Sequence, residues 1–131
     1  MPDRFVLVRS AADLALVLEA AAAPLHLVSD LNAGVHAGAG WWRALVDQCP
    51  AERLAVALLD CGDGSKAVLD ALAADVVDIV YSSNPAQPLA RALHDHAGLH
   101  GARLWPERPE AFDLRRRRDP LGDCRRWLDQ E

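Results

Sequence analysis

Residues 54–74 read LAVALLDCGDGSKAVLDALAA, and this stretch decides the fold. It begins with an uninterrupted apolar run, residues 54–59, which is typical of a strand buried on both faces of a parallel sheet. Turn-forming residues follow at 60–64. Asp63 or Ser65 then caps a helix that we expect to reach about Ala74. The stretch therefore predicts the strand–turn–helix unit from which α/β folds are built.

The same unit repeats on both sides of this stretch. We expect further short apolar strands at 5–8, 25–28, 76–81 and 102–105. Ser10 and Asp13 form a capping-box-like pair at the start of a helix that runs to about Ala23. A glycine-rich loop covers 31–40 and leads into a helix from Trp41 to about Cys49. We expect two more helices, at 84–98 with Asn84 as N-cap and at 120–128.

Short apolar strands that alternate with helices predict a mostly parallel sheet covered on both faces. We therefore expect a doubly wound five-stranded sheet in a three-layer α/β/α sandwich, with Rossmann-like or flavodoxin-like topology. Two strand orders, 2-1-3-4-5 and 3-2-1-4-5, remain open. A (β/α)₈ barrel is excluded because it takes about 250 residues, and this chain has 131.

The composition changes at Pro106. Residues 1–106 carry a net charge of −5 and form the expected sandwich domain, whereas residues 107–131 are arginine-rich but neutral overall. This C-terminal extension contains the run Arg115-Arg116-Arg117-Arg118. An acidic chain with a neutral extension does not favour nucleic acid as a partner. The run fits either a solvated tail or an arm that contacts the acidic domain of a second copy.

Three cysteines, Cys49, Cys61 and Cys124, fit a reducing compartment, since their number is odd and no CxxC motif occurs. We expect a cytoplasmic protein, and the alanine-rich, arginine-rich composition is typical of a GC-rich bacterial genome. No apolar run approaches the ~18–20 residues of a membrane span, and no signal peptide is recognisable at the start of the chain. A membrane location is therefore not expected.

Ligands of a doubly wound sheet bind at the carboxyl ends of its strands, near the point where strand order reverses. The polar residues that follow the expected strands are Arg9, Ser10, Asp30, His36, Asp60, Asp63, Ser82 and Ser83. One strand order places Arg9 opposite Asp60, and the other places it opposite Ser82 and Ser83. An arginine and helix N-terminal amides suit an anion or phosphate. The alternative is an Arg9–Asp60 ion pair beside ordinary helix caps.

Other site chemistries are poorly supported. The glycines of 34–40 lack the GxGxxG spacing, and Gly62-Asp63-Gly64-Ser65-Lys66 reverses the Lys-Ser/Thr order of a P-loop. Asp30, Asp60 and Asp63 could converge on a divalent cation, but aspartate is common in turns. We therefore expect neither a metal nor another cofactor, and catalytic residues cannot be assigned.

The remaining histidines and cysteines give weak signals. His94, His96 and His100 do not share one helix face at ligand spacing. His36 beside Asp30 could act as a general base, although a solvated loop histidine explains it as well. Cys61 follows a strand where helix amides favour a thiolate, but Asp60 and Asp63 oppose this effect.

Leu58-Leu59-Asp60 and Ser82-Ser83 resemble the third and fourth strand ends of response-regulator receiver domains, which carry the phosphorylated Asp and a nearby Ser or Thr. The resemblance extends over residues 4–106 as topology, but over only these positions as motif. Arg9-Ser10 replaces the acidic pair after the first strand, and no Lys ends the fifth. Without those acids the resemblance implies at most a non-phosphorylated relative, and we assign no family from it.

Two helices are too apolar for ordinary surface helices. In the first, Leu14, Val17 and Leu18 form one apolar face while Leu16 and Ala20 belong to another; residues 67–74 are similarly apolar. An all-round apolar helix is buried on both sides, although alanine also tolerates exposure. We therefore expect a homodimer that forms through these helix faces or through the C-terminal extension.

Two functional hypotheses follow. The first is a small cytosolic, non-catalytic binding or regulatory module that self-associates. The second is a small enzyme or sensor that binds an anionic small molecule at the carboxyl edge of the sheet. The first requires paired, sealed charges at that edge, and the second requires an open polar crevice.

Overall fold

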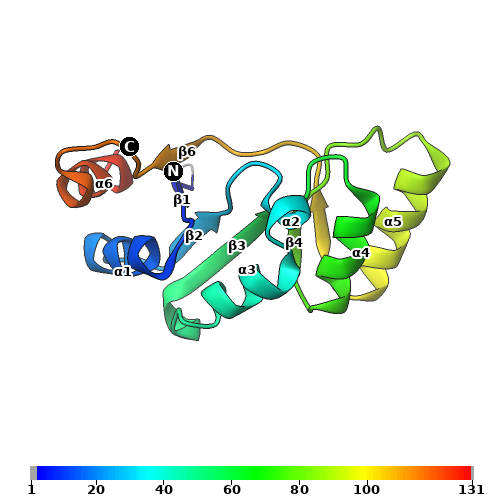
Figure 1. Ribbon diagram of the computed structural model, residues 1–131, viewed down its shortest axis with the longest axis horizontal. Helices are drawn as coiled ribbons and strands as arrows, with labels where there is room; N and C mark the ends of the chain where they lie inside the picture. The colour runs from blue at the N-terminus through cyan, green and yellow to red at the C-terminus, as the bar shows by residue number, and fades with distance from the viewer. Residues whose placement is uncertain (1–2, 131) are drawn as a thin grey trace.

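The computed structural model describes residues 3–130, which form six strands and six α-helices (Figure 1). The strands are β1 (Phe5–Leu7), β2 (Leu25–Val28), β3 (Leu54–Asp60), β4 (Asp78–Val80), β5 (Arg103–Trp105) and β6 (Ala111–Asp113). The helices are α1 (Ala11–Ala20), α2 (Ala33–His36), α3 (Ala39–Val46), α4 (Ser65–Ala73), α5 (Pro88–Leu99) and α6 (Pro120–Leu128), with a 3-10 turn, η1 (Ala51–Arg53), before β3. The predicted α/β class is confirmed: a parallel sheet is flanked by helices in a Rossmann-like or flavodoxin-like arrangement.

The sheet has six parallel strands in the order β5-β4-β3-β2-β1-β6. The prediction of five strands missed β6, and neither of the two strand orders considered from the sequence occurs. Strands β1 to β5 lie side by side in chain order. The order reverses at β1, which has β2 on one side and β6 on the other. The carboxyl ends of β1, β2 and β6 are therefore neighbours.

The residues after Pro106 complete this sheet. Strand β6 pairs with β1, with Phe5 opposite Ala111 and Leu7 opposite Asp113. Helix α6 spans the residues predicted for it, and its Trp127 donates a hydrogen bond through Nε1 to the carbonyl oxygen of Phe5 at 3.0 Å. The composition break at Pro106 thus separates two kinds of sequence, while both contribute to one sheet.

The two faces of the sheet are covered differently. Buried residues of α1, α3, α4, α5 and α6 form one cluster with strand residues such as Leu27, Leu59 and Ile79. The next residues along the same strands, including Val28, Leu58 and Val80, form a second, smaller cluster on the other face, because side chains alternate along a strand. Within residues 3–130, the second cluster contains strand residues alone.

Curvature of the sheet buries this second cluster. The rings of Phe5 in β1 and Trp105 in β5 lie edge to face with their centroids 5.8 Å apart. Neighbouring strands are spaced about 4.8 Å apart, so a flat sheet would separate β1 from β5 by roughly four such spacings, ~19 Å. The sheet therefore curls until its two ends approach, and its concave face closes on its own side chains.

Several helix boundaries differ from those predicted. The glycine-rich loop contains the short helix α2, and α3 begins two residues earlier than Trp41. Helix α4 has Gly64 as its N-cap, without a side-chain cap from Asp63 or Ser65. Helix α5 begins at Pro88 rather than near Asn84, whose side chain instead accepts a hydrogen bond from the amide of Ala86 in the preceding turn.

Helix α1 is covered within the same chain. Its residues Leu14 and Val17 are buried against the sheet, and Leu16 and Leu18 pack against the same core. Helix α6 packs beside α1 at one end of the molecule, while α4 and α5 lie together at the other end (Figure 1). The all-round apolar character of α1 is thus explained in part by a helix that follows it by a hundred residues.

Candidate functional site

Arg9 joins the carboxyl ends of three strands. Its Nη1 and Nη2 donate to the two carboxylate oxygens of Asp113 at 2.8 and 2.9 Å, and its Nε donates to Asp30 at 3.0 Å. Asp30 follows β2 and Asp113 ends β6, so the arginine sits where strand order reverses. The two-pronged contact with Asp113 matches the planar geometry of guanidinium and carboxylate. All three of these Arg9 nitrogens therefore donate hydrogen bonds to carboxylates of the same chain.

These contacts shift the ionisation of all three groups. The hydrogen bonds from Arg9 lower the pKa of the Asp113 carboxyl to about 2, with a further contribution from the amide of Arg115. The same guanidinium lowers the pKa of Asp30, which also accepts a hydrogen bond from the amide of Leu31. Asp113 in turn raises the pKa of Arg9. All three groups are therefore charged at neutral pH.

A second arginine neutralises the aspartate at the end of β3. Arg108 lies between β5 and β6, and its Nη1 donates to Asp60 at 2.8 Å while its Nη2 donates to the carbonyl oxygen of Ser29 at 2.7 Å. The Asp60 side chain is only 1% exposed. Its other oxygen accepts from the amide of Gly62, and its own amide donates to Ser29 Oγ. Both oxygens of the buried carboxylate are satisfied.

Ser10 has a structural role in this arrangement. Its hydroxyl accepts a hydrogen bond from the amide of Asp13 and caps α1, and Asp13 in return accepts from the amide of Arg9. The expected cap is confirmed, with the return bond made one residue earlier than in a capping box. Arg9 faces Asp30 and Asp113, rather than Asp60 or the two serines considered from the sequence.

An open hollow of about 530 Å³ lies beside the Arg108 contact. Its polar lining includes Asn32, Asp60, Asp63, Ser82, Glu107 and Arg108. Asp63 and Ser82 are exposed, whereas Ser83 is not among the residues that line the hollow. Three carboxylates and one paired arginine make this hollow acidic, so its charge opposes an anionic ligand.

His36 and Cys61 have separate expected roles, His36 as a general base beside Asp30 and Cys61 as a thiolate, and the surroundings of neither residue favour that role. His36 is exposed at the end of α2, and the hydrogen bonds of the Asp30 carboxylate come from Arg9 and Leu31. Cys61 is fully buried, and burial together with Asp60 raises the pKa of its thiol to about 12. A buried thiol with such a pKa is a poor nucleophile at neutral pH. The buried cysteines Cys49 and Cys124 also have raised pKa values.

Within the described part of the chain, no group of three or more His, Cys, Asp or Glu side chains is arranged to hold a metal ion. Asp30 and Asp60 each pair with a different arginine. A metal ion would therefore have to displace Arg9 from Asp30 and Arg108 from Asp60 in order to bind these two carboxylates.

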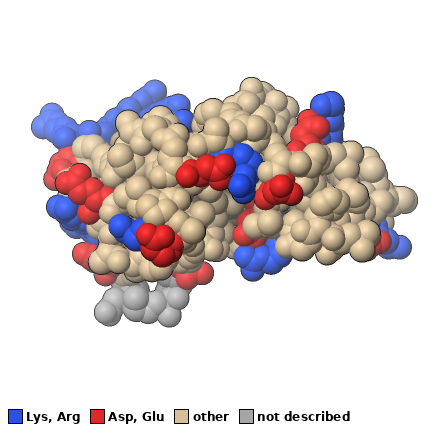
Figure 2. All heavy atoms as spheres, turned by 90° about the horizontal axis from the view of Figure 1, so that it is seen from below, with Lys and Arg blue, Asp and Glu red and all other residues tan. Residues whose placement is uncertain are grey.

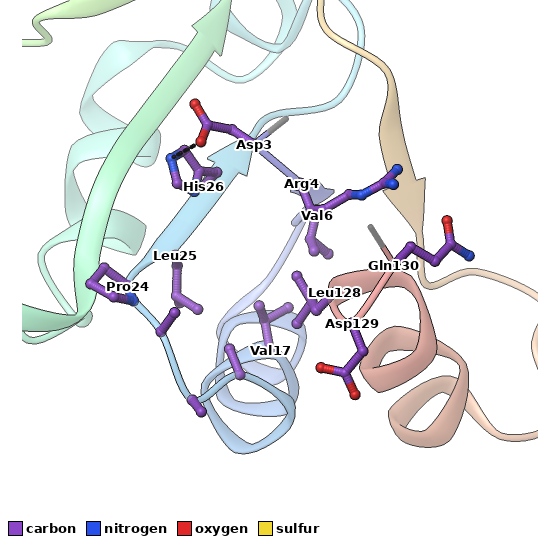
Figure 3. A pocket seen from close by; sticks show the side chains of 13 residues that line it. Asp3, Arg4, Val6, Val17, Pro24, Leu25, His26, Leu128, Asp129 and Gln130 are labelled. Atoms are coloured by element: carbon purple, nitrogen blue, oxygen red, sulfur yellow. Dashed lines mark ion pairs between the residues drawn. The ribbon is translucent and has the colours of Figure 1, made fainter. Parts of the chain in front are cut away.

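A separate cavity of about 290 Å³ lies at the amino-terminal edge of the sheet, between the ends of α1 and α6 (Figure 3). Val17, Leu25 and Leu128 point toward its interior, while the charged end of Arg4 points away. The ion pair between Asp3 and His26 lies at its rim, with 3.5 Å between Oδ1 and Nε2. This cavity is thus a mainly apolar gap left where α6 packs beside α1.

Sequence reasoning missed Arg108 and Asp113, the two residues that complete the charge network. Both lie beyond the composition break, in the residues assigned to the extension. The local signal for Asp113 is weak: Phe112 and Leu114 stand two positions apart, as on the buried face of a strand, but the segment is too short to predict one. The flanking prolines Pro106 and Pro109 mark Arg108 as part of an extended connection.

Comparisons with protein-family models, with curated proteins and with solved structures find no match to this chain. Over residues 3–130, no helix has both the length and the apolar character needed to cross a membrane.

Proposed function

We propose that this protein is a non-catalytic binding or regulatory module that acts by self-association. The observation that carries the proposal is the internal neutralisation of the carboxyl edge. Arg9 and Arg108, whose guanidinium groups lie at the carboxyl ends of the strands, are paired with Asp30, Asp113 and Asp60. An enzyme of this fold class would keep a nucleophile, base or anion-binding arginine free at that edge.

Exposed apolar side chains support the self-association. Large apolar residues with more than two-fifths of their surface exposed are Leu31, Val35, Leu69, Val77, Leu89 and Leu99. Figure 2 shows a broad uncharged area at the end of the molecule where α4 and α5 lie. Single exposed leucines are ordinary, but several on adjacent elements are typical of an interface.

The protein is proposed to act in the bacterial cytoplasm. Its three cysteines are free and buried. Unpaired thiols in the core suit a compartment in which disulfides do not form.

The alternative is a sensor that binds an anionic small molecule in the hollow near Arg108. The open shape of that hollow and the exposed hydroxyl of Ser82 favour a ligand site of some kind. The acidic lining weighs against an anion, because Asp63 and Glu107 would face it without a free cation to offset them.

Two measurements decide between these functions. Sedimentation equilibrium over a range of protein concentrations should show a reversible dimer. Thermal unfolding with phosphate, nucleotides or small carboxylates should show no rise in Tm beyond that caused by matched sodium chloride. A monomer at every concentration would overturn the self-association, and a saturable rise in Tm with one anion would favour the sensor.

A further inference from the structure

We propose that His96 and His100 form a binding site for a divalent transition-metal ion at the carboxyl end of α5. Both side chains are exposed, and their rings lie together, with 4.6 Å between the centroids and an angle of 64° between the planes. The site lies on the α4–α5 end of the molecule, away from α1 and α6 (Figure 1). This inference does not rest on the proposed self-association.

The course of α5 brings the two histidines to one face. The helix continues through Gly98 to Leu99 and has His100 as its C-cap, whereas the predicted end at Gly98 would have left His100 outside it. Residues four positions apart are neighbours on the surface of a helix. His94, by contrast, is half-buried and lies near Tyr81, with 6.4 Å between the ring centroids. The three histidines of α5 thus divide into an exposed pair and a single residue on another face.

A hydrogen bond fixes which nitrogen of His100 is free. Its Nδ1 lies 3.1 Å from the carbonyl oxygen of His96. A carbonyl oxygen can only accept, so Nδ1 carries the proton and Nε2 keeps the lone pair that a metal ion needs. Metal-bound histidines generally donate their other ring nitrogen to a carbonyl or a carboxylate in this way. Metal binding through Nε2 therefore preserves the bond that holds the ring in place.

The spacing of the rings suits two ligands of one ion. A Zn–N bond of about 2.0–2.1 Å places the metal roughly 3.2 Å from the centroid of each ring. With an angle of ~90–110° between the two bonds, the centroids lie ~4.5–5.2 Å apart. The observed 4.6 Å is within this range. Because the ring of His96 is exposed, it can turn a nitrogen toward the same point as Nε2 of His100 without a change in the backbone.

The ligands and their position decide the class of ion. Imidazole nitrogens bind Zn²⁺, Cu²⁺ and Ni²⁺, whereas Mg²⁺ and Ca²⁺ prefer oxygen ligands. The carboxyl end of a helix carries a partial negative charge that favours a cation, and the last turn of α5 contains neither Lys nor Arg. Two protein ligands leave the remaining positions of the ion to water. The ion therefore binds reversibly and is not required for folding, unlike the ion of a closed structural site.

Titration calorimetry of the untagged full chain with ZnCl₂ tests the site. The wild type should bind one Zn²⁺ per chain, and MgCl₂ at the same concentration should give no binding. His96→Ala removes one ligand but keeps the backbone carbonyl that His100 bonds. His100→Asn removes the other ligand and places a residue that is common at helix ends. Each variant should bind Zn²⁺ roughly tenfold more weakly or worse.

His36→Ala is the matched control. His36 is also exposed, but it lies at the end of α2, so this variant should bind Zn²⁺ as the wild type does. All three altered residues are exposed, and circular dichroism should show unchanged folding.

Two further measurements report on the geometry. The folded chain holds the two imidazoles together, so Zn²⁺ at about ten times its Kd should raise the Tm by roughly 5 °C, and His96→Ala should lose this rise. In histidine-selective NMR spectra, Zn²⁺ should shift the Nε2 signal of His100, while Nδ1 keeps its proton.

Three outcomes would overturn the proposal. The first is a Zn²⁺ affinity that is the same in the wild type and in His96→Ala. The second is a loss of affinity in His36→Ala equal to that in His96→Ala, since the ion would then bind exposed histidines without selection. The third is one Zn²⁺ bound for every two chains, which would mean that a single chain does not form the site.

Discussion

Arg9 and Arg108 close the same edge of the sheet, but they hold carboxylates of very different exposure. Arg108 pairs with Asp60, whose side chain is 1% exposed, whereas Arg9 pairs with Asp30 and Asp113, which are each 44% exposed. A buried carboxylate without its partner cannot recover its hydration, while a half-exposed one can. The number of hydrogen bonds is similar at the two sites. The burial of the carboxylate therefore decides how much stability the protein loses when each arginine is removed.

The two arginines also connect different parts of the chain. Arg9 follows β1 and joins the ends of neighbouring strands. Arg108 belongs to the connection from β5 to β6, which runs across the carboxyl ends of the sheet from one side of the molecule to the other (Figure 1). Its contacts with Asp60 and Ser29 fasten this connection over β3 and β2. Loss of Arg108 would therefore release this segment and also leave the buried charge of Asp60 without a partner.

The largest effect is expected from Arg108→Met. The variant keeps an apolar side chain of similar length but leaves Asp60 buried without a cation, which costs about 3–5 kcal/mol. Urea unfolding followed by tryptophan fluorescence should show a large decrease in the free energy of unfolding.

Arg118→Met is the matched control, since Arg118 is exposed and makes no ion pair within residues 3–130; it should change stability by less than about 0.5 kcal/mol. The double variant Asp60→Asn/Arg108→Met, which removes both charges, should regain much of the loss. A cost below about 1 kcal/mol for Arg108→Met would show that the burial of Asp60 does not govern this site.

The features predicted correctly from the sequence depend on local signals. Strand β2 and helix α6 have the predicted bounds, and Ser10 caps α1 through an amide three residues away. Asn84 shows how such a signal can mislead. Its side chain does bind a nearby amide, as in a helix cap, but the bond belongs to a turn and α5 begins four residues later. Capping and turn formation use the same hydrogen bond.

The charge network could not be predicted because it depends on strand order. The partners in the two strongest contacts are far apart in the chain: Arg9 and Asp113 are separated by 104 positions, and Arg108 and Asp60 by 48. The sequence places Arg9 at the strand ends correctly, but its partner follows only from the position of β6. That strand has three residues, too few for an alternation of apolar and polar residues to stand out.

Arg9→Met should have a smaller effect than Arg108→Met. Both acids of this cluster can become hydrated when the guanidinium is removed, so the loss is limited to the net value of the charged hydrogen bonds. We expect a decrease of about 1–2 kcal/mol in the free energy of unfolding, measured by urea in the same buffer. A cost equal to that of Arg108→Met would contradict the distinction between the two arginines.

The smallest expected effect is a change in the acid dependence of stability. The pKa of Asp113 in the folded protein is about 2, which is below its ordinary value of 3.8. Its contribution to stability is therefore complete above the ordinary pKa, and it is lost as the pH falls through 3.8 toward 2. Because its side chain is 44% exposed, solvent screening limits this contribution to about 1 kcal/mol.

Asp113→Asn tests this contribution. The variant should be less stable than the wild type at about pH 7, and the difference should shrink as the pH approaches about 3, because Asp113 of the unfolded wild-type chain then binds a proton while the folded protein does not. Asp129→Asn is the control, since that exposed carboxylate makes no ion pair within residues 3–130. Arg9→Met should flatten the same part of the pH profile, because the pKa values of Asp30 and Asp113 then rise toward their ordinary values. The free energies of unfolding of the wild type and Asp113→Asn could instead differ by a constant amount down to about pH 3. That result would mean that the contact between Arg9 and Asp113 stabilises the protein through its hydrogen bonds and not through the charge of Asp113.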